Sequence, residues 1–228
     1  MAQKLGTGKR FEVAEFKFSG YKCIVVYEKG LEKAVPLIKE GVLKASSLLN
    51  TKNDVIINAS ATDSGYVRDK MEGVAGSTLN GYMISLRINK GAARWKRFVV
   101  GIVAHEFNHV IRYQRIIRMD KTMLDNLVAE GLAQCFETQL TGMVRPWSKA
   151  ITNAQARAVL MKLKGRLDVE SQDMYTRVFL KEGDREFPHW SGYTIGYLMV
   201  GKRLEGLKRD WDMVVGMKSE AIAGKVGL

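Results

Sequence analysis

The sequence of 228 residues contains only two cysteines, Cys23 and Cys135, and only three histidines. Two isolated cysteines, neither of them in a CxxC pair, argue against a disulfide framework and against a cysteine-rich structural zinc site. No apolar run approaches the ~18 residues that a membrane-spanning helix needs. No apolar segment follows the amino-terminal MAQKLGTGKR to make a secretory signal. The sequence therefore predicts a reduced, cytoplasmic protein without a membrane span.

Basic side chains outnumber acidic ones: 36 Lys and Arg against 24 Asp and Glu give a formal net charge of +12. Such a charge can attract nucleic acid, an anionic membrane or an acidic substrate. The basic residues are nevertheless spread along the whole chain, with denser patches only at residues 87–97 and 112–118. We therefore interpret the charge as a solvated basic surface, and nucleic acid stays an alternative partner.

The first ninety residues alternate between strand-like and helix-like patterns. Strands are predicted at Tyr21–Tyr27, Asp54–Ala59 and Tyr82–Ile88, from β-branched or alternating residues. A helix is predicted within residues 31–50, and Pro36 marks either its start or a kink. The glycine-rich, polar stretch 60–81 is expected to be a loop.

After residue 93 the strand patterns fade and helical patterns take over. Helices are predicted at Arg94–Arg118, Met123–Leu140, Ile151–Leu167, Tyr193–Lys208 and Trp211–Lys225, with an ordered loop at Lys181–Gly192. The length fits one domain, or one domain with two lobes.

The stretch VVGIVAHEFNHVIRYQ (residues 99–114) contains two of the three histidines. On a helix, His105 and His109 lie on the same face one turn apart, and both imidazoles can reach one zinc ion. Glu106 is rotated by about 100° from His105, so it reaches a water on the metal rather than the metal itself. This is the HExxH pattern, which combines two metal ligands with a general base.

The neighbours of the motif distinguish a metal site from two ordinary core histidines. Apolar residues cover nearly every face of the predicted helix: Val99, Val100, Ile102, Val103, Phe107, Val110 and Ile111. The helix is therefore expected to be buried. Two imidazoles and a carboxylate without partners would be costly in that setting, and a metal ion removes the cost.

A catalytic zinc ion also needs a third protein ligand and an open position for water. One candidate is His189, and the others are Glu130 and Glu137 on the predicted helix Met123–Leu140. Glu130 has small neighbours, which let two helices approach closely. We choose Glu130 because its setting is the more buried, and interpret Glu137 as a surface or supporting charge. The sequence thus predicts one zinc ion per chain.

HEFNH and AEGLA, with twenty residues between His109 and Glu130, resemble the gluzincin clan of zinc metallopeptidases. YTIG, at residues 193–196, resembles the Tyr-x-x-Gly of gluzincin aminopeptidases. The whole pattern, with HWSGYTIGYLMV, is similar to the YjaZ-like family of predicted bacterial zinc-dependent proteases, over roughly residues 84–204. The resemblance implies that Tyr193, with His189 as a further or alternative donor, stabilises the oxyanion.

The resemblance also implies a zincin-like α+β fold in a single domain, 1–228. Residues 1–118 would form a small mixed-sheet lobe with the HExxH helix, residues 119–228 a helical lobe, and the cleft would lie between them. In that fold the strand YMISLRI is the sheet edge, so Ile84, Ser85 and Leu86 would bind an extended peptide by strand addition. The Gly-x-Met-Glu-Asn motif of the large aminopeptidases lacks a counterpart here, so amino-terminal trimming is not implied.

The predicted activity is hydrolysis of peptide bonds in a peptide or protein substrate. Zinc polarises the scissile carbonyl and lowers the pKa of its bound water toward ~7. Glu106 takes the water's proton and passes it to the leaving amine. Two alternatives remain: a basic, nucleic-acid-associated protein with a zinc site, and a non-catalytic interaction protein on the same scaffold. Glu106 argues against the latter, because a scaffold without catalysis needs no general base.

Overall fold

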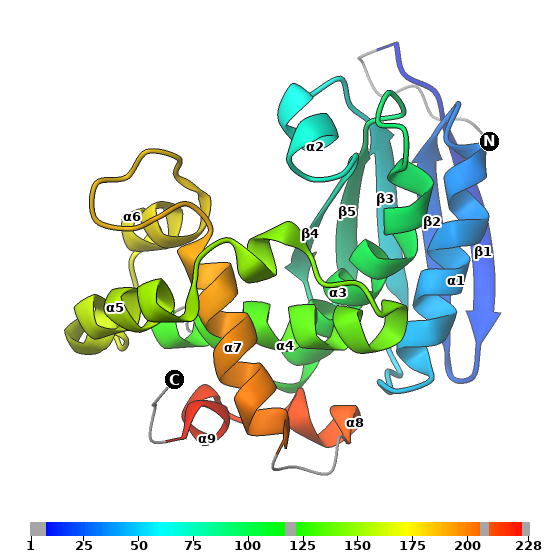
Figure 1. The fold of residues 1–228 in the computed structure, drawn as a ribbon. Helices are drawn as coiled ribbons and strands as arrows, with labels where there is room; N and C mark the ends of the chain where they lie inside the picture. Colours follow the sequence, from blue (N-terminus) through cyan, green and yellow to red (C-terminus); the bar gives the residue numbers. More distant parts are fainter. Residues whose placement is uncertain (1–7, 117–121, 206–209, 225–228) are drawn as a thin grey trace. The chain divides into compact units, whose positions relative to one another are not determined.

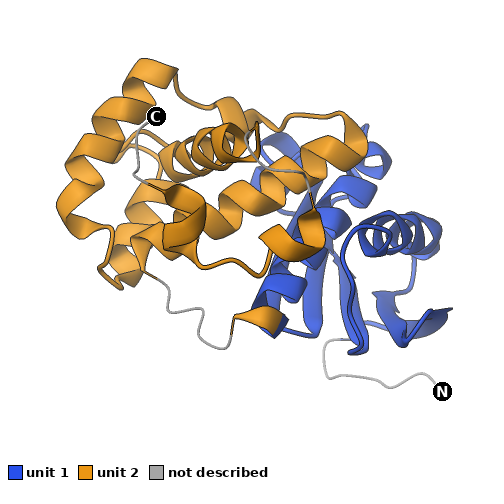
Figure 2. Ribbon diagram, turned by 90° about the horizontal axis from the view of Figure 1, so that it is seen from below, with its two compact units in different colours: residues 1–114 blue, residues 115–228 orange. Residues whose placement is uncertain are grey.

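The structure, a computed structural model, describes residues 8–116, 122–205 and 210–224. The chain falls into two compact units, residues 1–114 and residues 115–228 (Figure 2). The first unit contains a mixed sheet and the second is helical, which confirms the predicted α+β fold. That the two units make a single domain stays a prediction.

The first unit is built on a five-stranded sheet with the strand order β1-β2-β3-β5-β4. Its strands are β1 (Phe11–Phe18), β2 (Tyr21–Glu28), β3 (Val55–Ala61), β4 (Val74–Asn80) and β5 (Met83–Ile88). The three central strands β2, β3 and β5 are parallel, whereas β1 and β4 pair antiparallel at the two ends. Parallel neighbours need a crossover, and helix α1 (Val35–Ser46) lies in the one between β2 and β3.

Two helices of the first unit, α1 and α3 (Trp95–Arg115), pack closely against each other (Figure 1). A Cβ atom on Gly41 of α1 would lie 2.7 Å from the Cβ of Val103 on α3, so only glycine permits this approach. Pro36 lies in the first turn of α1, where its missing N–H costs nothing, so the helix starts there rather than kinking. The short helix α2 (Gly65–Asp69) precedes β4.

Strands β1 and β4 lie where the sequence predicts no strand. The β4 segment VAGSTLN contains glycine, serine and asparagine, residues typical of loops, and its polar side chains hide the alternation of a strand. Antiparallel pairing with β5 makes it a strand all the same. Its position beside the buried helix α3 therefore depends on long-range pairing that local sequence does not reveal.

The described part of the second unit is mainly helical, with a loop at residues 181–190 before the helix that begins at Ser191. The helices are α4 (Met123–Thr141), α5 (Asn153–Leu163), α6 (Gln172–Tyr175), α7 (Ser191–Glu205), α8 (Trp211–Val214) and α9 (Ser219–Ala223). The single helix predicted over residues 211–225 is thus two short helices. The predicted helix ends at 117–118, 206–208 and 225 lie outside the described residues. In the described part of the chain, no helix has both the length and the apolar character to cross a membrane.

Helices α4 and α7 cross in direct backbone contact (Figure 1). A Cβ atom on Gly131 would collide with the carbonyl of Gly196, and one on Gly196 would collide with the carbonyl of Leu127. Both glycines come from motifs singled out in the sequence, AEGLA and YTIG. Their physical role is to let the two helices that carry Glu130 and Tyr193 approach closely.

Candidate active site

Helix α3 carries both histidines of the HExxH motif in a buried setting. The exposed fractions are 6% for His105 and 8% for His109, and the neighbouring apolar residues are buried as predicted. The two imidazole rings lie edge to face, with their Nε2 atoms 3.2 Å apart. The two nitrogens therefore converge on one point beside the helix.

The spacing of the two nitrogens fits a shared metal ion. Two nitrogens at about 2.0–2.1 Å from one tetrahedral zinc ion lie roughly 3.3–3.4 Å apart, close to the 3.2 Å found between the Nε2 atoms. Glu130, the third ligand expected from the sequence, belongs to the second unit and carries a carboxylate. Imidazole nitrogens and a carboxylate are a donor set that zinc accepts, so these residues fit the ion.

Local sequence signals place Glu130 on α4. The helix begins at a capping box, in which Thr122 accepts from the Asp125 backbone N–H and Asp125 accepts from the Thr122 N–H. It ends at Gly142, whose φ of 69° favours glycine. Glu130 lies in the middle of this helix and is half-buried.

The expectation that Glu130 is more buried than Glu137 is wrong. Glu137 is the more buried of the two, at 1% exposed. The Arg145 guanidinium donates to its Oε1 at 2.6 Å and pairs with its charge. Glu137 therefore already has a charged partner, and Glu130 stays the predicted third ligand. Glu137 and Arg145 are eight residues apart in the sequence, and this spacing does not indicate that they form an ion pair.

Glu106 is held by two residues of the edge strand β4 that the sequence analysis missed. The Thr78 hydroxyl lies 2.8 Å from the Glu106 Oε2 and 2.9 Å from its backbone carbonyl oxygen. A Cβ atom on Gly76 would lie 2.5 Å from both Cγ and Oε1 of Glu106, so the carboxylate occupies the space that a side chain would fill. Glycine in a strand often marks such a close approach, and that signal was present in residues 60–81.

The prediction that the strand YMISLRI forms the sheet edge is wrong. Strand β5 lies between β3 and β4 and is hydrogen-bonded on both sides, so β4 is the edge strand. Ile84 and Leu86 are fully buried, and the Ser85 backbone lies opposite both Asn58 and Ser77. The three residues therefore cannot pair with an extended peptide by strand addition, because β5 is already paired with β3 on one side and with β4 on the other.

Tyr193 lies at the start of α7 and is linked to α4 by a buried glutamine. The Gln134 amide nitrogen donates to the backbone carbonyls of Glu130 and Tyr193, at 3.0 and 3.1 Å. Ser148 in turn donates to the Gln134 amide oxygen. The Tyr193 ring is half-buried and meets Phe179 edge to face. Gln134 thus connects the backbones of two predicted site residues, a role that sequence analysis did not identify.

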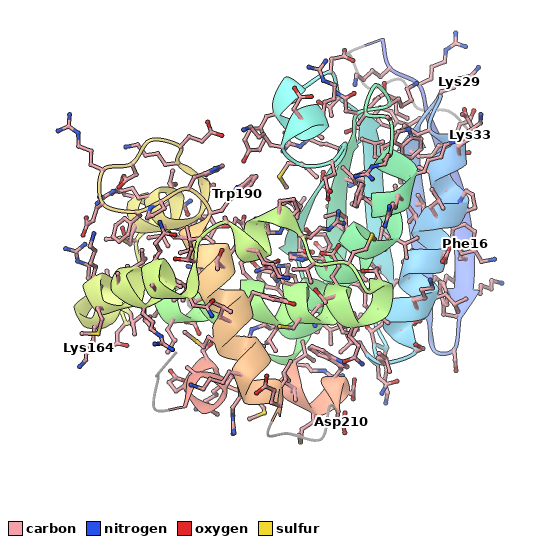
Figure 3. All side chains as sticks on the ribbon, viewed as in Figure 1. Phe16, Lys29, Lys33, Lys164, Trp190 and Asp210 are labelled. Atoms are coloured by element: carbon pink, nitrogen blue, oxygen red, sulfur yellow. The ribbon has the colours of Figure 1, made fainter. Side chains whose placement is uncertain are left out.

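His189 lies in the loop before α7, stacked on Trp190 with ring centroids 4.2 Å apart. Its Nδ1 is 3.8 Å from the Glu182 carboxylate. Trp190, at the turn into α7 (Figure 3), has a φ of 63°, which a bulky residue rarely adopts. The roles of His189 and Tyr193 as oxyanion donors stay predictions.

The loop that carries His189 is held by a charged cluster. Arg177 donates to the carboxylates of Asp184 and Glu186, at 2.9 Å each. The hydrogen bond from Arg177, together with backbone donors at Glu186 and Phe187, holds the pKa of Asp184 well below its usual range. The carboxylate is thus stabilised in its charged form.

Comparisons with known proteins identify a family and a similar fold. Residues 36–224 match the sequence profile of a family described as "Predicted Zn-dependent protease (DUF2268)". No curated protein sequence matches significantly. Among solved structures, the chain is similar to an aminopeptidase N family protein from Idiomarina loihiensis, with a TM-score of 0.54 and 11% sequence identity.

That likeness covers 93% of this chain and 43% of the Idiomarina protein, so the chain spans less than half of that protein's length. At this identity the likeness concerns the fold, which is that of an aminopeptidase-like zincin. The family profile covers most of the chain and includes the HExxH helix, Glu130 and Tyr193. The chain therefore belongs to this family of predicted Zn-dependent proteases.

Proposed function

We propose that this chain is a zinc-dependent peptidase in which His105, His109 and Glu130 bind the ion and Glu106 is the general base. The observation that carries the proposal is the pair of buried Nε2 atoms, 3.2 Å apart, on the same helix as a firmly held carboxylate. A carboxylate completes a donor set that zinc accepts, which supports the choice of Glu130 as third ligand. One ion per chain is proposed.

The chemistry divides between the ion and the protein. A zinc ion held there would act as a Lewis acid on the scissile carbonyl and on the attacking water. Glu106 accepts the proton of that water and delivers it to the nitrogen of the leaving amine. The burial of Glu106, at 5% exposed, keeps bulk water from competing for the proton.

We also propose that Tyr193 donates a hydrogen bond to the oxyanion that forms during attack, with His189 as the alternative donor. The firm attachment of Tyr193 to α4 through Gln134 and the Gly131–Gly196 crossing supports this choice. A preorganised donor is more effective than a mobile one. The stacking of His189 on Trp190 and its place near Glu182 leave it the weaker candidate.

The proposed substrate is a peptide or protein in extended form. An edge strand offers backbone N–H and C=O groups to an added strand, and β4 is the edge strand next to Glu106. We further propose that the protein works in a reducing compartment such as the cytoplasm, because a sequence with only two cysteines, neither of them in a CxxC pair, argues against a disulfide framework.

The test is cleavage of a peptide library by protein purified without added metal, with zinc content measured on the same sample. Glu106→Gln is expected to keep the zinc and to lose activity by ~10²–10⁴-fold, because an amide cannot accept the proton. Glu40→Gln, an exposed glutamate on α1 that pairs with Lys44, is the matched control and is expected to be fully active. Equal cleavage by wild type and Glu106→Gln would refute the mechanism. Salt-dependent nucleic-acid binding without cleavage would favour the alternative function.

A further inference from the structure

The edge strand β4 contacts the proposed general base with two residues on one face. Gly76 and Thr78 are two positions apart in the strand, so they face the same side of the sheet. Glu106 lies against both of them: its carboxylate fills the space above Gly76 and meets the Thr78 hydroxyl at 2.8 Å. We call Gly76 and Thr78 together the β4 notch.

We propose that the β4 notch positions the Glu106 carboxylate for proton transfer, and that Thr78 is the positioning residue. This inference rests on the proposed function, because it assigns Glu106 the role of base. The Thr78 side chain is assigned no contact with the substrate, whether or not the β4 backbone pairs with an extended peptide. It acts through Glu106, by fixing the direction in which the carboxylate points.

The argument begins with the freedom of a glutamate side chain. Glutamate has three rotatable bonds, so without contacts its carboxylate samples several positions. On α3 the position of the Glu106 Cα is fixed by a buried helix, but this leaves the carboxylate free to turn. Gly76 removes the steric barrier on one side and Thr78 supplies a hydrogen bond on that side. Together they select one orientation.

The choice of a hydroxyl suits a group that gains and loses a proton during the reaction. A hydroxyl can donate one hydrogen bond and accept others. Thr78 also lies 2.9 Å from the backbone carbonyl oxygen of Glu106. Its single hydrogen therefore has two acceptors within reach, the carboxylate and the carbonyl. The hydroxyl can hold the side chain whether it donates to the carboxylate or accepts from the protonated carboxyl.

Because proton transfer is sensitive to misplacement by about an ångström, loss of the notch should lower the rate more than the affinity. Thr78→Val keeps the shape of the side chain and removes the hydroxyl. We expect kcat to fall by about 10- to 100-fold, with KM changed by less than about twofold and zinc content unchanged. Thr78→Ser, which keeps the hydroxyl, should restore most of kcat.

The matched control is Thr51→Val in the same unit. The Thr51 hydroxyl is also largely buried and hydrogen-bonded, to the Gln114 side chain at 2.8 Å. This variant should lose stability as Thr78→Val does, while its kcat stays at the wild-type value. Thr78→Ala and Gly76→Ala are further variants: the former removes the hydroxyl without adding bulk, and the latter forces the carboxylate out of its place.

A second readout does not depend on activity. Crystal structures of zinc-loaded wild type and Thr78→Val, or Thr78→Ala if the valine variant does not fold, report the orientation of Glu106. We expect one orientation on the β4 notch in wild type and a displaced or multiple carboxylate in the variant. The same orientation in both would overturn the inference, as would an unchanged kcat in both hydroxyl-free variants. A wild-type protein that cleaves no peptide would refute the proposed function alone, since the crystal comparison still tests the notch.

Discussion

Replacing Glu137 with glutamine tests whether Glu137 has a structural role on α4 that differs from the metal-binding role proposed for Glu130. Both Glu137 and its partner Arg145 are almost completely buried, at 1% and 2% exposed. The Arg145 guanidinium donates from Nε at 2.6 Å and also lies over the Trp147 ring, 5.5 Å from its centroid. Glu137→Gln removes the negative charge and leaves the positive charge of Arg145 in an environment that excludes water.

The expected loss of stability follows from this burial. Removing one member of a buried ion pair typically costs about 3–5 kcal/mol, because the remaining charge has no counter-charge. For a protein of this size, each kcal/mol lowers the melting temperature by about 2–4 °C. Glu137→Gln should therefore lower the melting temperature by roughly 6–20 °C. The zinc content of the folded protein should stay that of wild type.

Thermal unfolding followed by circular dichroism, with zinc measured on the folded sample, tests both expectations. Glu130→Gln is the matched control: the same chemical change on the same helix should abolish zinc binding, since Glu130 is the proposed ligand. The double variant Glu137→Leu with Arg145→Met should recover much of the stability, because apolar replacements of a buried pair are often neutral. If Glu137→Gln lost zinc and kept its melting temperature, Glu137 rather than Glu130 would be the ligand.

Three further changes test other parts of the structure. Tyr193→Phe should lower kcat by ~10²–10³-fold and leave KM and zinc content nearly unchanged; unchanged steady-state kinetics would remove Tyr193 from the mechanism. Gly131→Ala should cost about 1–3 kcal/mol in chemical denaturation through overpacking at the α4–α7 crossing, whereas Gly165→Ala, which meets only open space, should be neutral. Asp184→Asn should destabilise the protein at pH 7. Because Arg177 lowers the pKa of Asp184 in the folded state, this difference should shrink as the pH falls through that lowered pKa; a difference that grew in acid would contradict the assignment.

The sequence predicts the parts of the site that depend on local pattern. His105, Glu106 and His109 form a motif within five residues, and the apolar residues around them predict a buried helix without further information. The structure confirms that burial. The ends of helix α4 can also be predicted from the sequence, because Thr122 and Gly142 are residue types that cap the two ends of a helix.

The parts that depend on long-range pairing could not be read in the same way. The sequence of strand β4 resembles a loop, because Gly76 and Thr78 contact Glu106 and do not follow the alternation of apolar and polar residues in a strand. Which strand forms the sheet edge depends on the order of pairing, which side-chain pattern does not encode. The ion pair between Glu137 and Arg145 is also a contact that the local sequence pattern does not indicate. Burial does not single out Glu130 as the ligand, because Glu137 is the more buried of the two.

The most direct test of the central proposal is anomalous X-ray diffraction from crystals of the protein, with data collected on both sides of the zinc absorption edge. The proposal predicts one zinc peak per chain, bonded to the Nε2 atoms of His105 and His109 and to the Glu130 carboxylate, at about 2.0–2.2 Å from each. A zinc peak at other residues would contradict it, as would crystals grown with zinc that show no peak at these three side chains.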